Sequence, residues 1–315
     1  MMKTKLLFAI LSFAFAITLT ACSSGNNDDE TEPNATETPY TYEIHNGETS
    51  INEIPNGINT VSPPFGGYAY APQEFADTIA TAIATADELM SAHSVMGMSV
   101  AFVDADTGFT WAQGFGIADT VLDTRVDEHT IMHLGSVSKT FTAVAVMQLV
   151  EQGVIDLDNP IVYYLPDFYI SPSPTGGDFR NITPRMLLTH TSGILPSFLG
   201  YGLLTIGAYN PDYLNDMLEN LANYFMVAPE GTVFAYANKG YDILGILVAY
   251  LTGNNNFFDD FVSYTDENIF ARAGMTRSTF AICDELIPYR AMAYIDASRR
   301  DIFVYYNGIP TGGVF

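Results

Sequence analysis

The segment that decides the fold opens with Gly135-Ser136-Val137-Ser138-Lys139, because a mostly apolar helical pattern follows it directly. We expect one long helix from Ser136 that ends near Gly153, since glycine is favoured just after the last helical turn. The apolar residues that recur at helical spacing are Phe141, Val144, Ala145, Met147 and Val150. A serine and a lysine three residues apart therefore stand at the beginning of an apolar helix.

The serine and the lysine have the spacing of a catalytic pair. Residues i and i+3 lie on one helix face, with Cβ atoms roughly 5–6 Å apart. At the helix N-terminus, Ser136 gains the positive end of the dipole, which favours a developing alkoxide. The chain has few other lysines, so we do not expect Lys139 to be an ordinary exposed residue without a specific role. The alternative is that Ser136 only caps the helix and Lys139 is a solvated residue of its first turn.

The surrounding pattern places strands at both ends of the domain and helices in its middle. Residues 72–93, 186–188, 213–225 and 241–251 read as helical, and residues 97–103, 109–116, 290–295 and 302–306 as strands. The turn Asp104–Gly108 joins two of these strands into an antiparallel hairpin. This order differs from the alternating strands and helices of a doubly wound parallel sheet. It predicts an α/β protein of the α+β type, with an antiparallel sheet flanked by helices.

The first 21 residues have the layout of a signal peptide. Lys3 and Lys5 precede an apolar run, Leu6 to Ala21, that is shorter than the about 20 residues of a comfortable membrane span. The ending Leu19-Thr20-Ala21-Cys22 resembles the bacterial lipoprotein box, which implies lipidation of Cys22. We therefore expect an extracytoplasmic protein anchored by lipid to a bacterial membrane. The alternative is an ordinary signal peptide in which Cys22 is incidental.

Charge and composition then separate a tether from a domain. Residues 22–71 are rich in acidic, Thr, Pro and Asn residues, and we expect an acidic flexible tether there. Its later part, residues 40–70, carries apolar residues that could lie against the domain predicted for residues 72–315. The formal net charge of -24 argues against nucleic acid as a partner and against recruitment to lipid by a basic patch.

Three further segments accompany the Ser-x-x-Lys motif: Leu187 to Ile194, Tyr236-Ala237-Asn238, and Pro310-Thr311-Gly312-Gly313. Together the four resemble, in the same order, the serine β-lactamase and penicillin-binding-protein superfamily, and most of all its class C-like branch. That branch includes D-alanyl-D-alanine peptidases and esterases, and the resemblance covers about residues 72–315. It implies a β-lactamase/transpeptidase-like fold with a helical subdomain at about residues 152–234.

The resemblance also implies a role for each motif residue. Ser136 would be the nucleophile of an acyl-enzyme, Lys139 would share its proton, and Tyr236 would be general base and then acid. Asn238 would hold a substrate amide, and His190 would belong to a structural turn. The implied function is a serine hydrolase acting on an amide, ester or β-lactam in a small molecule or peptide. We expect no cofactor and no metal, since His129 and His133 lack the glutamate and the further ligands of a zinc motif.

The last motif of the superfamily departs from its pattern here. Relatives carry Lys-Thr-Gly or His-x-Gly on a strand beside the nucleophile, but no Lys or His follows Lys239 in these 315 residues. We expect an N-terminal portion of a longer enzyme, without its C-terminal strands, and a chain that is itself inactive. The alternatives are a non-catalytic cell-envelope lipoprotein that binds peptidoglycan peptides, and an inactive truncated remnant.

Overall fold

The computed structural model describes residues 58–61, 69–171, 176–195, 205–206, 213–254, 256–281, 286–296, 299–300 and 304–305. The predicted signal peptide, Cys22 and the Pro310–Gly313 motif lie outside these residues. None of the helices in the described part of the chain is both long and apolar enough to cross a membrane.

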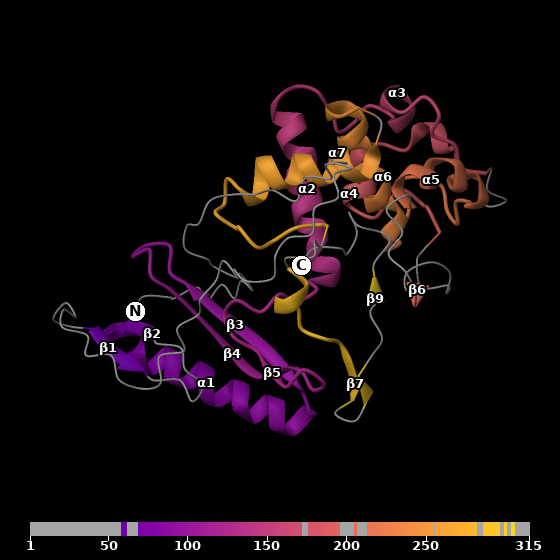
Figure 1. The fold of residues 1–315 in the computed structure, drawn as a ribbon. Coiled ribbons are helices and arrows are strands. Elements are labelled where there is room, and N and C mark those ends of the chain that lie inside the picture. Colours follow the sequence, from indigo (N-terminus) through magenta and orange to yellow (C-terminus); the bar gives the residue numbers. More distant parts are fainter. Residues whose placement is uncertain are drawn as a thin grey trace, which may run out of the picture.

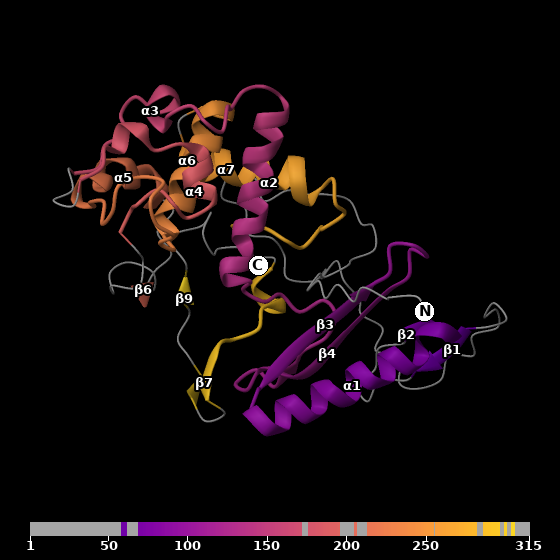
Figure 2. The same ribbon diagram turned by 180° about the vertical axis from the view of Figure 1, so that it is seen from behind.

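An antiparallel hairpin and one long helix form the first half of the domain. Strands β3 (Gly97–Val103) and β4 (Thr110–Asp119) pair from Gly97 with Gly116 to Val103 with Thr110, which confirms the predicted hairpin. The short β5 (Thr124–Arg125) extends the sheet in the order β3-β4-β5. Helix α1 (Gln73–His93) runs along this sheet in both views (Figures 1 and 2). Phe75 of α1 stacks on Phe109 with ring centroids 5.1 Å apart, which ties the helix to the hairpin.

Two short strands precede α1. Strands β1 (Ile58–Val61) and β2 (Ala69–Pro72) pair antiparallel and both contact α1. They fall almost entirely within residues 22–71, in the later part of the predicted tether that carries the apolar residues. Residues 58–61 and 69–71 of the predicted tether therefore lie against α1.

The second half of the domain is helical. Its helices are α2 (Ser138–Glu151), α3 (Ile161–Tyr164), α4 (Pro184–Leu188), α5 (Tyr213–Asn220), α6 (Asn238–Thr252) and α7 (Phe257–Thr265). Short 3₁₀ turns lie at Gly135–Val137, Phe179–Asn181, Leu221–Asn223 and Ile287–Tyr289, and a π-turn lies at Asp266–Phe270. Helix α6 is the centre of this half, because its residues from Asn238 to Ala249 are all buried.

Helices from outside residues 152–234 belong to the same core as those inside that range. Side chains of α2, α6 and α7 pack with those of α3, α4 and α5 in one apolar cluster. Both views show this helical half on one side and the sheet with α1 on the other, with the beginning of α2 directed toward the sheet (Figures 1 and 2). The N-terminus of α2 therefore lies near the border between the two halves.

The strand predicted at residues 290–295 is shorter in the structure. Of residues 290–295, only the end belongs to a strand, β7 (Tyr294–Asp296), which pairs with β8 (Arg299–Arg300). Of residues 302–306, β9 (Val304–Tyr305) pairs with β6 (Thr205–Ile206). Arg290 pairs with Ile131 in an isolated parallel bridge, directly after the 3₁₀ turn Ile287–Tyr289.

Candidate active site

Ser136 lies in a tight turn just before α2, not in its first helical turn as predicted. Gly135 has a φ of 54°, in the left-handed region that glycine enters without steric cost, and residues Gly135–Val137 form a 3₁₀ turn. No side-chain hydrogen bond caps this turn or α2, so Ser136 is not simply a capping residue. The Ser136 side chain is exposed, which leaves its hydroxyl open to a substrate.

Two polar side chains converge on the Ser136 hydroxyl. Lys139 Nζ donates a hydrogen bond to Ser136 Oγ over 3.2 Å, and the Tyr236 hydroxyl donates to the same oxygen over 2.8 Å. Lys139 is only 6% exposed, which excludes the alternative of a solvated first-turn residue. Its Nζ lies 5.0 Å from the centroid of the Tyr236 ring and 5.7 Å from that of Tyr241. The structure thus brings the predicted serine, lysine and tyrosine together.

Tyr236 reaches the serine from the segment that leads into α6. Ala237 is extended, with φ -128° and ψ 110°, and Asn238 begins the helix. The change from extended to helical backbone directs Tyr236 out of the helical core, while Asn238 is only 5% exposed. The assignment of Asn238 to a substrate amide stays a prediction.

The other lysine of this region, Lys239, is buried within the helical half. Its Nζ lies 3.3 Å from Asp242 Oδ2, one helical turn further along α6, and both side chains are at most 10% exposed. The same Nζ lies 5.5 Å from the centroid of the Tyr224 ring. Burial, and then the charge of Asp242, raises the pKa of Tyr224. This ion pair is part of the packing of α6 and was not predicted, since Lys-x-x-Asp has no distinctive sequence signal.

His190 packs against the ring of Tyr236. The ring centroids of His190 and Tyr236 are 4.3 Å apart, and His190 Nδ1 accepts a hydrogen bond from the Ala237 N–H over 3.3 Å. Burial, and then the positive charge of Lys139, lowers the pKa of His190. The sequence predicted a structural turn at His190 but not its contact with Tyr236.

Serine, lysine and tyrosine thus meet at the beginning of a helix, as the resemblance to the serine β-lactamases and penicillin-binding proteins implied. The Beta-lactamase family model matches residues 82–315, and the chain belongs to this family. The chain is 32% identical over 221 residues to Penicillin-binding protein 4 of Amycolatopsis lactamdurans, an alignment that covers 68% of this chain and 52% of that protein.

Solved structures show the same fold. A class C beta lactamase superposes with a TM-score of 0.62 at 20% sequence identity, covering 76% of this chain and 62% of the other. D-alanine carboxypeptidase AmpC from Burkholderia cenocepacia superposes with a TM-score of 0.60 at 22% identity, covering 76% of this chain and 60% of the other. The chain spans about half the length of the curated relatives that it matches first.

Proposed function

We propose that this protein is a serine hydrolase that acts through an acyl-enzyme on an amide, ester or β-lactam. The observation that carries the proposal is the pair of hydrogen bonds that Lys139 and Tyr236 make to Ser136 Oγ. A serine hydroxyl is a weak nucleophile until a neighbouring group takes its proton. Two such groups lie within hydrogen-bonding distance of this oxygen, and Ser136 is an exposed residue.

The proposed reaction follows from these contacts. Tyr236, whose hydroxyl donates to Ser136 Oγ in the structure, first gives its proton to solvent; Ser136 Oγ then attacks the substrate carbonyl carbon, and its proton passes to the phenolate oxygen of Tyr236. The nearby ammonium of Lys139 stabilises the negative charge that Tyr236 carries before it takes that proton. When the tetrahedral intermediate collapses, Tyr236 returns the proton to the leaving amine or alcohol, and the acyl group stays on Ser136. Water then attacks the acyl-enzyme and gives its proton to Tyr236, which returns it to Ser136.

The surroundings of the serine and the names of the relatives support a proposal for the substrate class. Apolar side chains are exposed just before Tyr236, with Val233 at 44% and Phe234 at 71% exposure, and they could contact an apolar part of a substrate. Asn238 would hold a substrate amide. The names of the relatives support penicillins and D-alanine peptides as candidate substrates. The alternative function is a lipoprotein that binds peptidoglycan peptides without cleaving them.

Covalent labelling tests the proposal. Because the sequence predicts that residues 1–315 alone are inactive, a version completed at its C-terminus is incubated with a fluorescent penicillin and, separately, with an activated phosphonate ester, and the adduct is located by mass spectrometry. We expect the adduct on Ser136 and its loss in Ser136→Ala, while Ser91→Ala, an exposed serine of α1, labels normally. An adduct on the buried Ser138 or Ser192 would contradict the assignment. Reversible penicillin binding without an adduct would favour the binding protein.

We also propose that Cys22 carries lipid and anchors the protein at the outer face of a bacterial membrane. The order of positive charge, apolar run, small residues and cysteine in residues 1–22 supports this location. The acidic segment that follows would hold the domain away from the membrane surface.

A further inference from the structure

We infer that His190 is a positioning residue that holds Tyr236 in place against Ser136. The inference rests on the proposed role of Tyr236 as proton carrier. A proton carrier works only within hydrogen-bonding distance of its partner, so a group that fixes its position controls the rate.

His190 binds the chain on both sides of Tyr236. Its backbone carbonyl accepts a hydrogen bond from the Ala235 N–H over 2.8 Å, and its Nδ1 accepts one from the Ala237 N–H over 3.3 Å. The imidazole also packs on the phenol ring, with centroids 4.3 Å apart and the planes inclined by 34°. One residue therefore fixes the backbone before and after Tyr236 and supports its ring.

The position of His190 is itself fixed by an unusual backbone conformation. Its φ is 57°, in the left-handed region that residues other than glycine seldom adopt. This conformation reverses the chain after α4, so that the His190 carbonyl and ring both face residues 235–237. The N–H of His190 donates to the Leu187 carbonyl over 3.2 Å, and the Thr191 N–H donates to the Met186 carbonyl over 2.8 Å. These bonds close the end of α4 and hold the turn.

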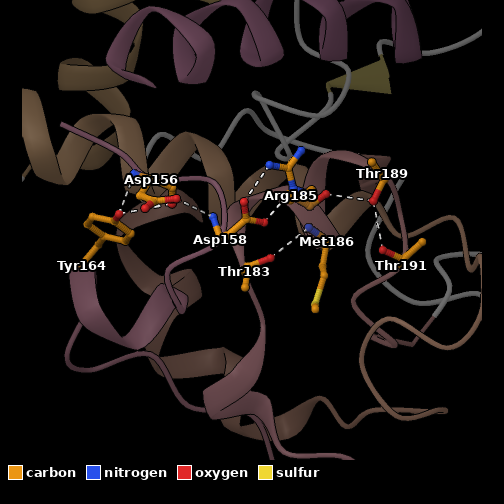
Figure 3. A network of polar contacts seen from close by, with 8 residues as sticks. All are labelled: Asp156, Asp158, Tyr164, Thr183, Arg185, Met186, Thr189 and Thr191. Carbon is orange, nitrogen blue, oxygen red and sulfur yellow. Dashed lines mark hydrogen bonds and ion pairs between the residues drawn. The ribbon is translucent and has the colours of Figure 1, made fainter. Parts of the chain in front are cut away.

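Polar contacts around α4 brace the turn from the far side (Figure 3). Thr183 Oγ1 caps α4 by accepting from the Met186 N–H. Arg185 binds both carboxylate oxygens of Asp158, at 2.7 and 2.8 Å. The residues on either side of His190 point toward each other, with 2.9 Å between the hydroxyls of Thr189 and Thr191. Arg185 therefore anchors α4 and the turn after it to the segment at Asp158.

The hydrogen bond to Nδ1 requires a histidine without a proton on that nitrogen. Three charged or titratable groups face the imidazole: Lys139 from α2, Tyr236 from the segment before α6, and Tyr241 from α6. Burial and the positive charge of Lys139 both favour the neutral imidazole. Acid would therefore remove the acceptor for the Ala237 N–H and release one of the bonds that hold Tyr236.

Two substitutions of His190 distinguish the contribution of its side chain to the position of Tyr236 from that of its left-handed backbone conformation. His190→Asn and His190→Gly both fit a left-handed residue, but only asparagine offers a side-chain oxygen near the place of Nδ1. The rate at which an activated p-nitrophenyl carboxylic ester acylates Ser136 is measured against pH in the full chain. His93→Gln, an exposed histidine at the end of α1, is the matched control.

We expect His190→Gly to slow acylation by about 10²-fold, the loss typical of a small misplacement of a reacting group. His190→Asn should recover most of that rate and should lose the decline on the acid side that the wild type shows as His190 protonates. If both variants slow acylation equally, or if the acid decline persists in His190→Asn, the inference is wrong.

A readout that does not depend on catalysis keeps the inference testable if Ser136 is not acylated. In protein with ¹³C-labelled tyrosine, the Tyr236 signal is assigned by its absence in Tyr236→Phe. We expect this signal to shift in the wild type as acid protonates His190, and to stay constant over the same pH range in His190→Asn. A Tyr236 signal that follows pH identically in both proteins overturns the inference, while absence of acylation with the expected shift overturns only the proposed function.

Discussion

Tyr236→Phe removes the proposed proton carrier with the least disturbance of its surroundings. The substitution deletes the hydroxyl that lies 2.8 Å from Ser136 Oγ and keeps the ring that packs on His190 and faces Lys139. Loss of a general acid–base group lowers a rate by about 10²–10⁴-fold, which is about 2.7–5.4 kcal/mol of activation free energy. The free energy of unfolding should change far less, because the one hydrogen bond lost is worth about 0.5–1.5 kcal/mol and its acceptor is exposed.

The assay compares the rate of Ser136 acylation with thermal stability in the same proteins. Tyr164→Phe is the matched control, since it also deletes a phenol hydroxyl. That hydroxyl accepts from the Asp156 N–H over 2.7 Å (Figure 3). We expect Tyr164→Phe to lower the melting temperature without slowing acylation, and Tyr236→Phe to do the reverse. A Tyr236→Phe protein that acylates within about tenfold of the wild type, below the usual range for acid–base catalysis, would refute the proposed role.

Three further substitutions test separate parts of the structure. Lys139→Arg should abolish labelling of Ser136, because arginine keeps the charge but does not give up its proton, and labelling at the normal rate would make Lys139 structural. Cys22→Ser should release the protein from the membrane fraction and change its electrophoretic mobility, and an unchanged distribution would contradict the lipid anchor. Burial raises the pKa of Asp266 from 3.8 to about 7, so the folded state keeps a proton that the unfolded state loses, and stability should fall as pH rises between these values. Asp266→Asn should flatten that part of a denaturation profile, and an equal slope in both proteins would show that Asp266 does not titrate there.

Short-range sequence patterns predicted those helices and strands that are stabilised by contacts between residues close in the sequence. The hairpin of β3 and β4 follows from two strand patterns around an Asp-Gly turn, in which Asp104 accepts from the Thr107 N–H as such turns do. Gly153 follows the end of α2 with a φ of 74°, as the glycine pattern predicted. By contrast, α7 was not predicted, because its sequence Phe257–Thr265 is short and rich in aromatic residues. Its helical form depends on packing against α6 and on a cap at Asn256, whose side chain accepts from the Asp259 N–H.

The contacts of the candidate active site are likewise of two kinds, between residues close in the sequence and between residues far apart in it. Ser136 and Lys139 are three residues apart, so their contact could be predicted from helix geometry even though a 3₁₀ turn holds the serine. Tyr236 is 100 residues further along the chain, and no periodicity relates it to Ser136. Only the resemblance of the Tyr-x-Asn motif identified Tyr236 as the partner of Ser136. The motif does not show which contacts keep Tyr236 in position.

Backbone hydrogen bonds keep Tyr236 in position, and these cannot be predicted from the sequence. The peptide groups on both sides of the tyrosine bind His190, and His190 can make both bonds only because it adopts a left-handed conformation at the end of α4. That conformation depends in turn on α4 and the residues that brace it, including the ion pair between Arg185 and Asp158. Because the ion pair is exposed, it should contribute little to stability by itself. The ion pair supports α4, α4 supports the turn at His190, and His190 positions Tyr236. The position of the Tyr236 hydroxyl therefore depends on residues that do not contact a substrate.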